Sequence, residues 1–193
     1  MATPKELRNS ILRKRDNLEK SEIEAKSRLI QDRLLQMPEV AEAKILFVYI
    51  SFRSEVATLD LVDKLIEMGK TVTVPITRVA AKRLDAVKIT DRAKDLEPGY
   101  CNIPEPTEIL CTEKSIDPKL IETIILPGSV FDLRGGRFGY GGGFYDRFVS
   151  QVENAVRIGL AFDLQIVDKA PLQDHDELLD LVVTEKRVIR GSR

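Results

Sequence analysis

The sequence predicts an α/β fold of three layers, a sandwich in which helices cover both faces of a mainly parallel β-sheet. Continuous apolar runs of strand length occur at residues 44–50 and 122–126, and such runs are typical of strands buried on both faces. Segments with apolar residues at helical spacing alternate with the strand-like runs. In a sheet of this kind ligands bind beyond the carboxyl ends of the strands, so the loops at those ends are the places to look for a site.

Length and composition indicate one ordinary globular domain that spans residues 1–193. The chain is 43% hydrophobic and 32% charged, and its formal net charge of -1 argues against general nucleic-acid binding. No apolar run approaches membrane-spanning length and the N-terminus carries no signal-peptide core, so we expect a cytoplasmic protein without a membrane partner. The only cysteines, Cys101 and Cys111, are expected to be free thiols, which fits a reducing cytoplasm.

Two helices are predicted before the first strand. Thr3 and Glu6 form a capping box, and the helix that follows carries one apolar stripe. Ser21 and Glu24 offer a second capping box, and the helix that it would start is expected to stop at Pro38. The basic residues near the N-terminus are interpreted first as a solvated helix face. They are Lys5, Arg8, Arg13, Lys14 and Arg15.

After the first strand, apolar spacing predicts a helix over residues 59–66 that Gly69 closes as a C-terminal cap. Strands are predicted at 71–75 and at 85–89, the second in a direction that can be antiparallel. Residues 90–118 are polar and contain four prolines, so a long irregular connection is expected there. Loops of that length are often functional.

The strand at 122–126 leads into a glycine-rich stretch, and a helix is expected after Gly143 because apolar residues then recur at helical spacing. Two further strands are predicted at 157–162 and 178–184, with a short edge strand at 188–189. The glycine-rich stretch therefore lies at the carboxyl end of a buried strand, where an α/β sheet binds its ligands.

The rest of the chain is organised around residues 126–147. Seven of the 11 glycines lie between Gly128 and Gly143. Backbone N–H groups of successive glycines can form an anion-binding nest, and the positive end of the following helix adds to it. Arg137 can supply a bidentate phosphate contact, and Asp146 can face the same anion through Mg²⁺. Compensation of the helix dipole is the alternative role for Asp146.

The common nucleotide motifs do not fit this stretch. No P-loop sequence occurs, and the Gly-x-Gly-x-x-Phe sequence that ends at Phe144 fails the last position of the dinucleotide fingerprint. Tyr140, Phe144 and Tyr145 either pack in the core or stack on a planar ring. His175, the only histidine, lies in an acidic segment and is interpreted as part of a surface loop rather than as a catalytic base.

One motif carries a family resemblance: Pro127-Gly-x-x-Phe131-Asp132, then Gly-Arg137-Phe-Gly-Tyr-Gly-Gly-Gly-Phe-Tyr145-Asp146-Arg147. It resembles the signature of the 5-formyltetrahydrofolate cyclo-ligases, also called methenyltetrahydrofolate synthetases. Weaker similarities follow in the right order along nearly the whole chain. They are Lys5-Glu-Leu-Arg8 with Arg13-Lys-Arg15, Tyr49-Ile50 through Ser54-Glu55-Val56, Asn102-Ile-Pro104-Glu-Pro106 and Asp180-Leu-Val-Val-Thr184-Glu185.

The resemblance implies a three-layer α/β/α fold similar to that of ribose-phosphate isomerases and CoA transferases, and an ATP- and Mg²⁺-dependent cyclisation. The formyl oxygen of 5-formyltetrahydrofolate attacks the γ-phosphate of ATP to give a phosphorylated imidate. N10 attacks the activated carbon, and phosphate leaves to give 5,10-methenyltetrahydrofolate. Such chemistry needs positioning and charge neutralisation more than a protein nucleophile. ATP and the folate would be the partners of a chain that is expected to act as a monomer, without nucleic acid.

The resemblance also implies roles for individual residues. Arg137 and Tyr140 would be catalytic, and Asp146 and Asp180 would hold the metal. ATP would be bound by Lys5, Arg8, Arg137, Gly139, Gly141, Gly142, Gly143 and Tyr145. The folate would be framed by Ile50, Glu55, Tyr140 and Phe144, with Glu55 hydrogen-bonded to the amino edge of the pterin.

Three positions depart from the pattern of the family. Many members carry a lysine where this chain has Gly142, a tyrosine where it has Phe144, and a lysine or arginine where it has Ile76. The rival hypotheses are a nucleotide- or sugar-phosphate-binding module on the same fold and an RNA-associated regulatory protein. The first lacks a convincing isomerase base, and the near-neutral net charge weakens the second.

Overall fold

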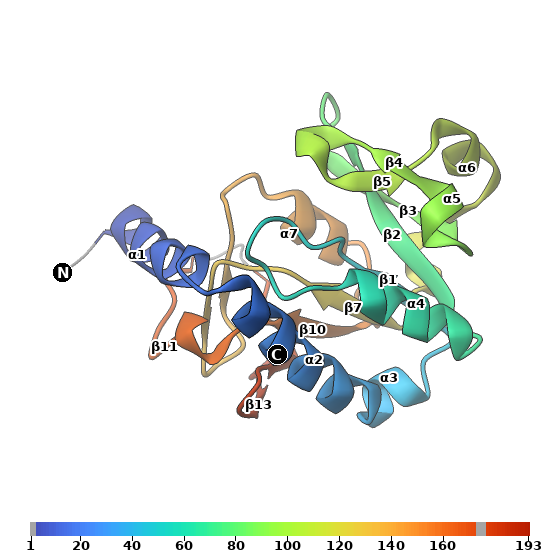
Figure 1. Ribbon diagram of the computed structural model, residues 1–193. Helices are drawn as coiled ribbons and strands as arrows, with labels where there is room; N and C mark the ends of the chain where they lie inside the picture. Colours follow the sequence, from blue (N-terminus) through green and yellow to red (C-terminus); the bar gives the residue numbers. More distant parts are fainter. Residues whose placement is uncertain (1–2, 173–176) are drawn as a thin grey trace.

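An eight-stranded sheet forms the middle layer of the computed structural model, which describes residues 3–172 and 177–193 (Figure 1). The strands from β12 to β2 run parallel, whereas β13, β3 and β6 pair antiparallel with their neighbours. In spatial order they are β13 (Val188–Arg190), β12 (Leu181–Val183), β10 (Val156–Leu160), β7 (Thr123–Leu126), β1 (Ile45–Val48), β2 (Thr71–Arg78), β3 (Arg83–Ile89) and β6 (Ser115–Ile116). The prediction of a mainly parallel sheet in an α/β fold is confirmed.

The central strands are mostly apolar, as suits strands that are covered on both faces. Leu46 and Ile125 point into one hydrophobic cluster, and their neighbours Phe47 and Ile124 point into a second cluster on the opposite face. On the first face pack α2 (Lys20–Leu35), α3 (Pro38–Ala41) and α4 (Leu59–Glu67). On the second face packs α7 (Phe144–Val149), where Phe148 stacks on Phe47 with ring centroids 4.3 Å apart.

Local capping explains the ends of several helices. α1 (Pro4–Asp16) has the predicted capping box between Thr3 and Glu6, and Gly69 takes a left-handed φ of 76° just after α4. The second predicted capping box is wrong. α2 begins at Lys20 after Glu19, which makes no side-chain cap bond, so Ser21 lies inside the helix. That helix ends at Leu35, and the proline beyond it opens α3.

The segment from Thr90 to Pro118 is not the irregular connection that was expected. It contains α5 (Arg92–Asp95), β4 (Leu96–Pro98), η1 (Tyr100–Asn102), β5 (Pro104–Pro106), α6 (Glu108–Glu113) and β6. β4 and β5 form a two-stranded antiparallel sheet, where prolines are tolerated because each strand has an edge without ladder bonds. Glu105 fastens this hairpin, since its carboxylate accepts from the backbone N–H groups of Thr77 (3.0 Å) and Tyr100 (3.1 Å).

The glycine-rich stretch also has more structure than a single turn. β8 (Val130–Asp132) and β9 (Arg137–Phe138) form a hairpin, and β11 (Ile166–Val167) completes a three-stranded sheet with them. The fully buried carboxylate of Asp132 accepts from the backbone N–H groups of Gly136 at 2.8 Å, and of Arg134 and Ala170, both at 2.9 Å. The hairpin is therefore built around one buried acid, Asp132. The glycines that precede α7 follow the hairpin in the chain.

The remaining described elements are the short helices η2 (Pro118–Leu120) and η3 (Asp163–Gln165). Across residues 3–172 and 177–193, no helix combines the length and the apolar character that a membrane crossing requires. Cys101 and Cys111 are free thiols, as predicted, the first exposed and the second buried. The interpretation of His175 as a loop residue falls outside the described residues.

Candidate active site

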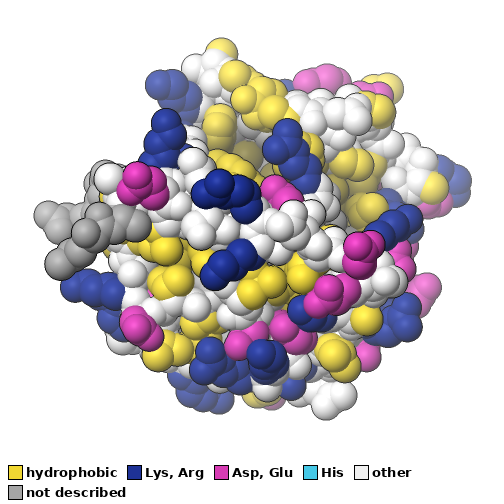
Figure 2. All heavy atoms as spheres, turned by 60° about the vertical axis from the view of Figure 1, so that its left-hand side comes forward, with side chains coloured by type: hydrophobic (Ala, Val, Ile, Leu, Met, Phe, Trp, Pro, Cys, Tyr) yellow, Lys and Arg dark blue, Asp and Glu magenta, His cyan; other side chains and the backbone are white. Residues whose placement is uncertain are grey.

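The candidate site lies beyond the carboxyl ends of β1 and β7, where the loops after these strands meet α1. α1 lies at the side of the sandwich and contacts η3, which follows β10 (Figure 1). Figure 2 shows the face that carries α1: it is hollowed, hydrophobic side chains lie in the hollow, and several Lys and Arg side chains surround it. An apolar floor with cations around it suits a ligand that combines a planar ring with anionic groups.

The N-terminal half of α1 supplies Arg8 to the glycine loop, residues 139–143. Nη1 of Arg8 donates to the carbonyl oxygen of Gly139 at 3.3 Å, and the guanidinium lies 5.5 Å from the centre of the Phe138 ring. A Cβ atom on Gly141 would lie 3.7 Å from the same Nη1 atom. Lys5 is exposed one turn earlier on the helix. The structure thus brings together two segments that the resemblance joined and that are far apart in sequence.

The glycine loop has a backbone that other residues would not readily adopt. Gly141 and Gly143 have φ angles of 88° and 64°, both in the left-handed region. Gly143 is the N-cap residue of α7, and a Cβ atom there would lie only 2.7 Å from Nη1 of Arg147. Arg147 in turn fastens the loop, donating from Nη2 to the carbonyl of Gly142 at 2.7 Å and from Nε to the carbonyl of Lys82 at 2.6 Å.

Arg137 and Asp146 are partners in this structure. Nη2 of Arg137 lies 2.5 Å from Oδ1 of Asp146, and the arginine side chain is buried whereas the aspartate is 26% exposed. Nη1 of Arg137 also donates to the carbonyl oxygen of Pro127 at 3.4 Å. Only one carboxylate oxygen of Asp146 takes part in this pair, so the other remains available to a hard cation. Mg²⁺ is commonly held by one or two carboxylates together with substrate phosphates, so this single acid suits it.

No group of three or more His, Cys, Asp or Glu side chains that could hold a metal occurs in the described part of the chain. Asp180 does not join Asp146, which corrects the suggestion that the two would share a metal. Asp180 precedes β12, at the amino edge of the sheet, whereas Asp146 lies beyond the carboxyl ends. Its Oδ2 atom is taken up by the backbone N–H of Arg157 and by Nη1 of Arg193, both at 2.8 Å.

Glu55 is the buried acid of the site. It lies in the loop after β1, as does Ile50, which is also buried, and its Oε2 atom accepts from the backbone N–H of Phe52 at 2.9 Å. Burial raises the pKa of Glu55 to about 7, although the Phe52 N–H and the charge of Arg15 act in the opposite direction. A carboxyl group near half-ionisation at neutral pH can act as a donor or an acceptor of hydrogen bonds.

The aromatic residues of the stretch divide between core and surface. Tyr145 packs against both hydrophobic clusters, and burial and the nearby Glu55 raise the pKa of its phenol. Phe144 is half-buried, with the Arg147 guanidinium 5.5 Å from its ring centre. Tyr140 is 51% exposed and keeps its hydroxyl within reach of Arg15. Of the two possibilities left open for these side chains, Tyr145 takes the core position, and stacking of Tyr140 on a planar ring stays a prediction.

Arg15 is the site residue that the sequence reasoning missed. It was assigned to a solvated helix face, yet it is 1% exposed. It donates to Ser54 Oγ at 3.1 Å, to the carbonyl oxygen of Gly128 at 3.4 Å and to the Tyr140 hydroxyl at 2.9 Å. Its position seven residues after Arg8, two helical turns on, was the available signal, because such a spacing places both arginines on one face of α1.

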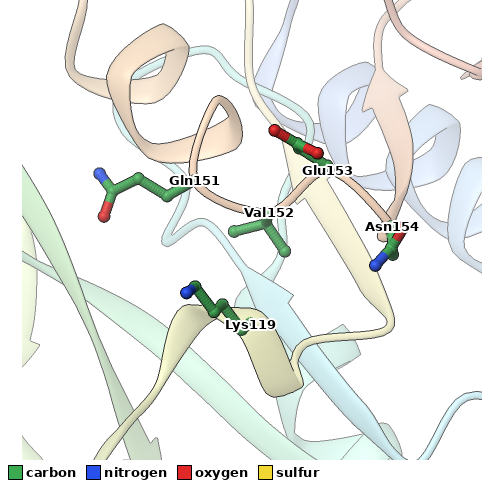
Figure 3. Close-up of a pocket in the computed structure, with 5 residues that line it drawn as sticks. All are labelled: Lys119, Gln151, Val152, Glu153 and Asn154. Carbon is green, nitrogen blue, oxygen red and sulfur yellow. The ribbon is translucent and has the colours of Figure 1, made fainter.

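Two surface pockets lie at the opposite edge of the sheet. Figure 3 shows one of about 270 Å³, formed by η2 before β7 and by the loop between α7 and β10. Its lining residues are Lys119, Gln151, Val152, Glu153 and Asn154. The second includes Asp180 and Arg190 beside the first residues of β10 and β12. Both adjoin the amino ends of the parallel strands, away from the glycine loop.

Comparison with known proteins agrees with this geometry. The model of the 5-formyltetrahydrofolate cyclo-ligase family matches residues 1–185. A Caenorhabditis elegans protein named probable 5-formyltetrahydrofolate cyclo-ligase is 29% identical over 180 residues, covering 89% of this chain and 87% of that protein. The 5-formyltetrahydrofolate cyclo-ligase of Escherichia coli K12 is 31% identical over 159 residues, covering 81% and 86%.

Solved structures show the same likeness. The NMR structure of the Aquifex aeolicus 5,10-methenyltetrahydrofolate synthetase superposes with a TM-score of 0.85 at 30% identity, covering 97% of this chain and 92% of that one. A 5,10-methenyltetrahydrofolate synthetase from Mycoplasma pneumoniae has a TM-score of 0.75 at 21% identity, covering 95% and 99%. The second likeness supports the shared fold alone.

Proposed function

The chain belongs to the 5-formyltetrahydrofolate cyclo-ligase family of enzymes, and we propose that it converts 5-formyltetrahydrofolate to 5,10-methenyltetrahydrofolate with consumption of ATP. The observation that carries the proposal is the hydrogen bond of Arg8 to the glycine loop on one side of the site, and on the other side Arg15, which bonds to the Tyr140 hydroxyl and acts through its charge on the buried Glu55. One side offers cations and backbone N–H groups, and the other offers a buried acid and aromatic rings. These two chemistries match a triphosphate and a pterin respectively.

On the phosphate side, Lys5, Arg8 and Arg137 would neutralise the charge of ATP, and the N–H groups of the glycine loop would contact its oxygens. Gly142 offers no side-chain cation in the glycine loop, so Lys5 and Arg8 of α1 would carry more of that charge. Asp146 would hold Mg²⁺ together with the phosphates, and the ion would reduce the repulsion between the γ-phosphate and an incoming oxygen.

On the folate side, Ile50 and Phe144 would frame the pterin, and the Glu55 carboxylate would accept hydrogen bonds from its amino edge. The bound formyl group would then face the γ-phosphate. Its oxygen attacks phosphorus, the bond to ADP breaks, and the formyl carbon becomes a phosphorylated imidate. N10 attacks that carbon and loses its proton to solvent or phosphate, and inorganic phosphate leaves with the former formyl oxygen.

Purified protein mixed with Mg-ATP and 5-formyltetrahydrofolate tests the proposal. Absorbance of the methenyl product and release of ADP should rise together in equal amounts. Omission of ATP, and separately of Mg²⁺, should each abolish both signals. Absence of product at substrate concentrations well above that of the enzyme would overturn the assignment. Action as a cytoplasmic monomer belongs to the same proposal, and sedimentation of the purified chain tests the oligomeric state.

A further inference from the structure

Arg15 is a buried cation in the last turn of α1 that no step of the proposed reaction uses. Its three hydrogen bonds lead to three different segments. Ser54 lies in the loop between β1 and α4, next to Glu55, whereas Gly128 follows β7 and Tyr140 belongs to the glycine loop. Ser54 in turn donates its hydroxyl hydrogen to the carboxylate of Asp16. One guanidinium thus ties the loop that carries Glu55 to the segment after β7 and to the glycine loop at Tyr140.

Among the described residues, no carboxylate forms a direct ion pair with Arg15. None of the ion pairs formed within residues 3–172 and 177–193 includes it. Burying an uncompensated charge lowers stability, and such groups concentrate at functional sites. The acid that feels this charge is Glu55. Its other titratable neighbours are Tyr49, in the loop just after β1, and Tyr145 of α7.

We propose that Arg15 is a positioning residue for the folate: it orients the Tyr140 hydroxyl and holds the Glu55 loop against the glycine loop. The inference rests on the proposed function. Its positive charge has a second consequence, because it favours the ionised form of Glu55, the form that accepts hydrogen bonds from a pterin. Loss of Arg15 should therefore disturb both the geometry and the protonation of the folate side, and leave the phosphate side less affected.

Three substitutions separate these effects. Arg15→Met removes the charge and all three hydrogen bonds, whereas Arg15→Lys keeps the charge but cannot make three bonds in the same geometry. Tyr140→Phe removes only the hydroxyl acceptor. Arg13→Met is the matched control, because Arg13 is an exposed arginine of the same helix whose Nε bonds only to the carbonyl of Asn9 at 3.3 Å. The measurements are kcat, KM for each substrate, and the pH dependence of kcat/KM for the folate.

Wild-type kcat/KM for the folate should rise with pH as Glu55 ionises. In Arg15→Met, kcat/KM for the folate should fall at least about tenfold, mainly because KM for the folate rises, and the midpoint of its pH dependence should move to higher pH. Arg15→Lys and Tyr140→Phe should show a similar fall in kcat/KM and keep the wild-type midpoint. Arg13→Met should match the wild type. A purely structural role would lower the melting temperature and the active fraction without moving the midpoint or favouring one KM.

If the wild type makes product, and Arg15→Met has the same folate kinetics and the same midpoint of the pH profile as the wild type, the inference is overturned and the proposed function stays intact. A wild type that makes no product would overturn the proposed function instead. Should Arg15→Met fail to fold, Arg15→Lys, Tyr140→Phe and the double variant decide the question. If kcat/KM for the folate in the double variant is no lower than in the less active single variant, the result supports positioning through Tyr140. A loss in the double variant equal to the product of the two single losses contradicts it.

Discussion

The carboxylate of Asp146 and the guanidinium of Arg137 face each other across the glycine loop, with Nη2 and Oδ1 2.5 Å apart. Arg137 comes from β9 and is buried, whereas Asp146 comes from the first turn of α7 and is 26% exposed. The pair therefore joins the hairpin to the helix and leaves the acid within reach of a ligand. Binding of a metal–phosphate complex would exchange this contact for contacts to the ligand, with the cation and the anion each gaining a new partner.

Asp146→Asn should lower kcat by about 100-fold or more, because a neutral amide is a poor ligand for Mg²⁺ and the loss corresponds to about 3 kcal/mol of transition-state stabilisation. Steady-state kinetics at saturating Mg-ATP measure the loss. The melting temperature should change little, since the aspartate is partly exposed. Near-normal turnover with a small loss of helix stability would assign Asp146 to dipole compensation instead.

Asp132→Asn should show the reverse behaviour. Burial alone would raise the pKa of Asp132, but hydrogen bonds from Arg134, Ala170 and Gly136 outweigh it, so the pKa is lowered. The ionised form thus stabilises the fold above pH 3.8, and this contribution disappears as pH falls through the lower folded-state pKa. An amide cannot accept all these bonds, so unfolding in urea at neutral pH should require roughly 2–3 kcal/mol less.

The matched control for that experiment is Asp146→Asn, which makes the same chemical change in a partly exposed side chain. A variant Asp132→Asn that unfolds at the wild-type urea concentration would contradict the role of this acid as the centre of the hairpin. Turnover of Asp132→Asn should fall only in proportion to the folded fraction. The Asp132 carboxylate is fully buried, and its hydrogen bonds lead to the hairpin and to Ala170 rather than to the ligand site.

Glu55→Gln should increase stability at alkaline pH and abolish folate turnover. The folded-state pKa of Glu55 is raised from 4.5 to about 7, so its contribution to stability is complete below pH 4.5 and is lost as pH rises to about 7. Glutamine does not ionise. Between about pH 5 and pH 8 the variant should therefore gain roughly 2 kcal/mol relative to the wild type in urea unfolding. Parallel pH dependences of the two proteins would show that Glu55 is not held in this environment.

Gly143→Ala should destabilise the protein by about 1–2 kcal/mol, because an alanine resists the left-handed φ of 64°. The added Cβ atom would also displace Arg147, so KM for ATP should rise several-fold. Gly139→Ala is the matched control for stability: its φ is not in the left-handed region, and its Cβ atom would meet Nη1 of Arg137 at an ordinary 3.4 Å. Equal melting temperatures for the two variants would contradict this account of the loop.

Patterns of neighbouring residues predicted much of the fold correctly. The apolar runs identified buried strands, since alternate side chains of one strand enter two different clusters, and the Thr3 box and Gly69 marked real helix ends. Prediction failed where contacts between distant segments decide the structure. The hairpin of β8 and β9 depends on the burial of Asp132, and the β4–β5 hairpin depends on the attachment of Glu105 to β2.

The candidate site shows the same division. The places of Glu55 and the glycine loop followed from the sequence, because their segments come after β1 and β7 and so lie at the carboxyl edge of the parallel sheet. The place of Arg8 followed from the family motif alone, since α1 precedes every strand. Asp180 was assigned to the metal because it belongs to a motif at a strand, but it lies at the amino end of that strand, on the wrong edge of the sheet. A motif identifies residues, but whether they come before or after a parallel strand decides at which edge of the sheet they lie.

The sequence by itself therefore determined the α/β class, the mainly parallel arrangement of the buried strands, and the place of the glycine loop after a buried strand, because these depend on residues close together in the chain. Only the tertiary structure decided the fate of Arg15. Its partners Ser54, Gly128 and Tyr140 are 39, 113 and 125 positions away, and local spacing carries no information on contacts of that range. Whether a helical arginine meets water or a buried hydroxyl is settled when the distant loops pack against its helix.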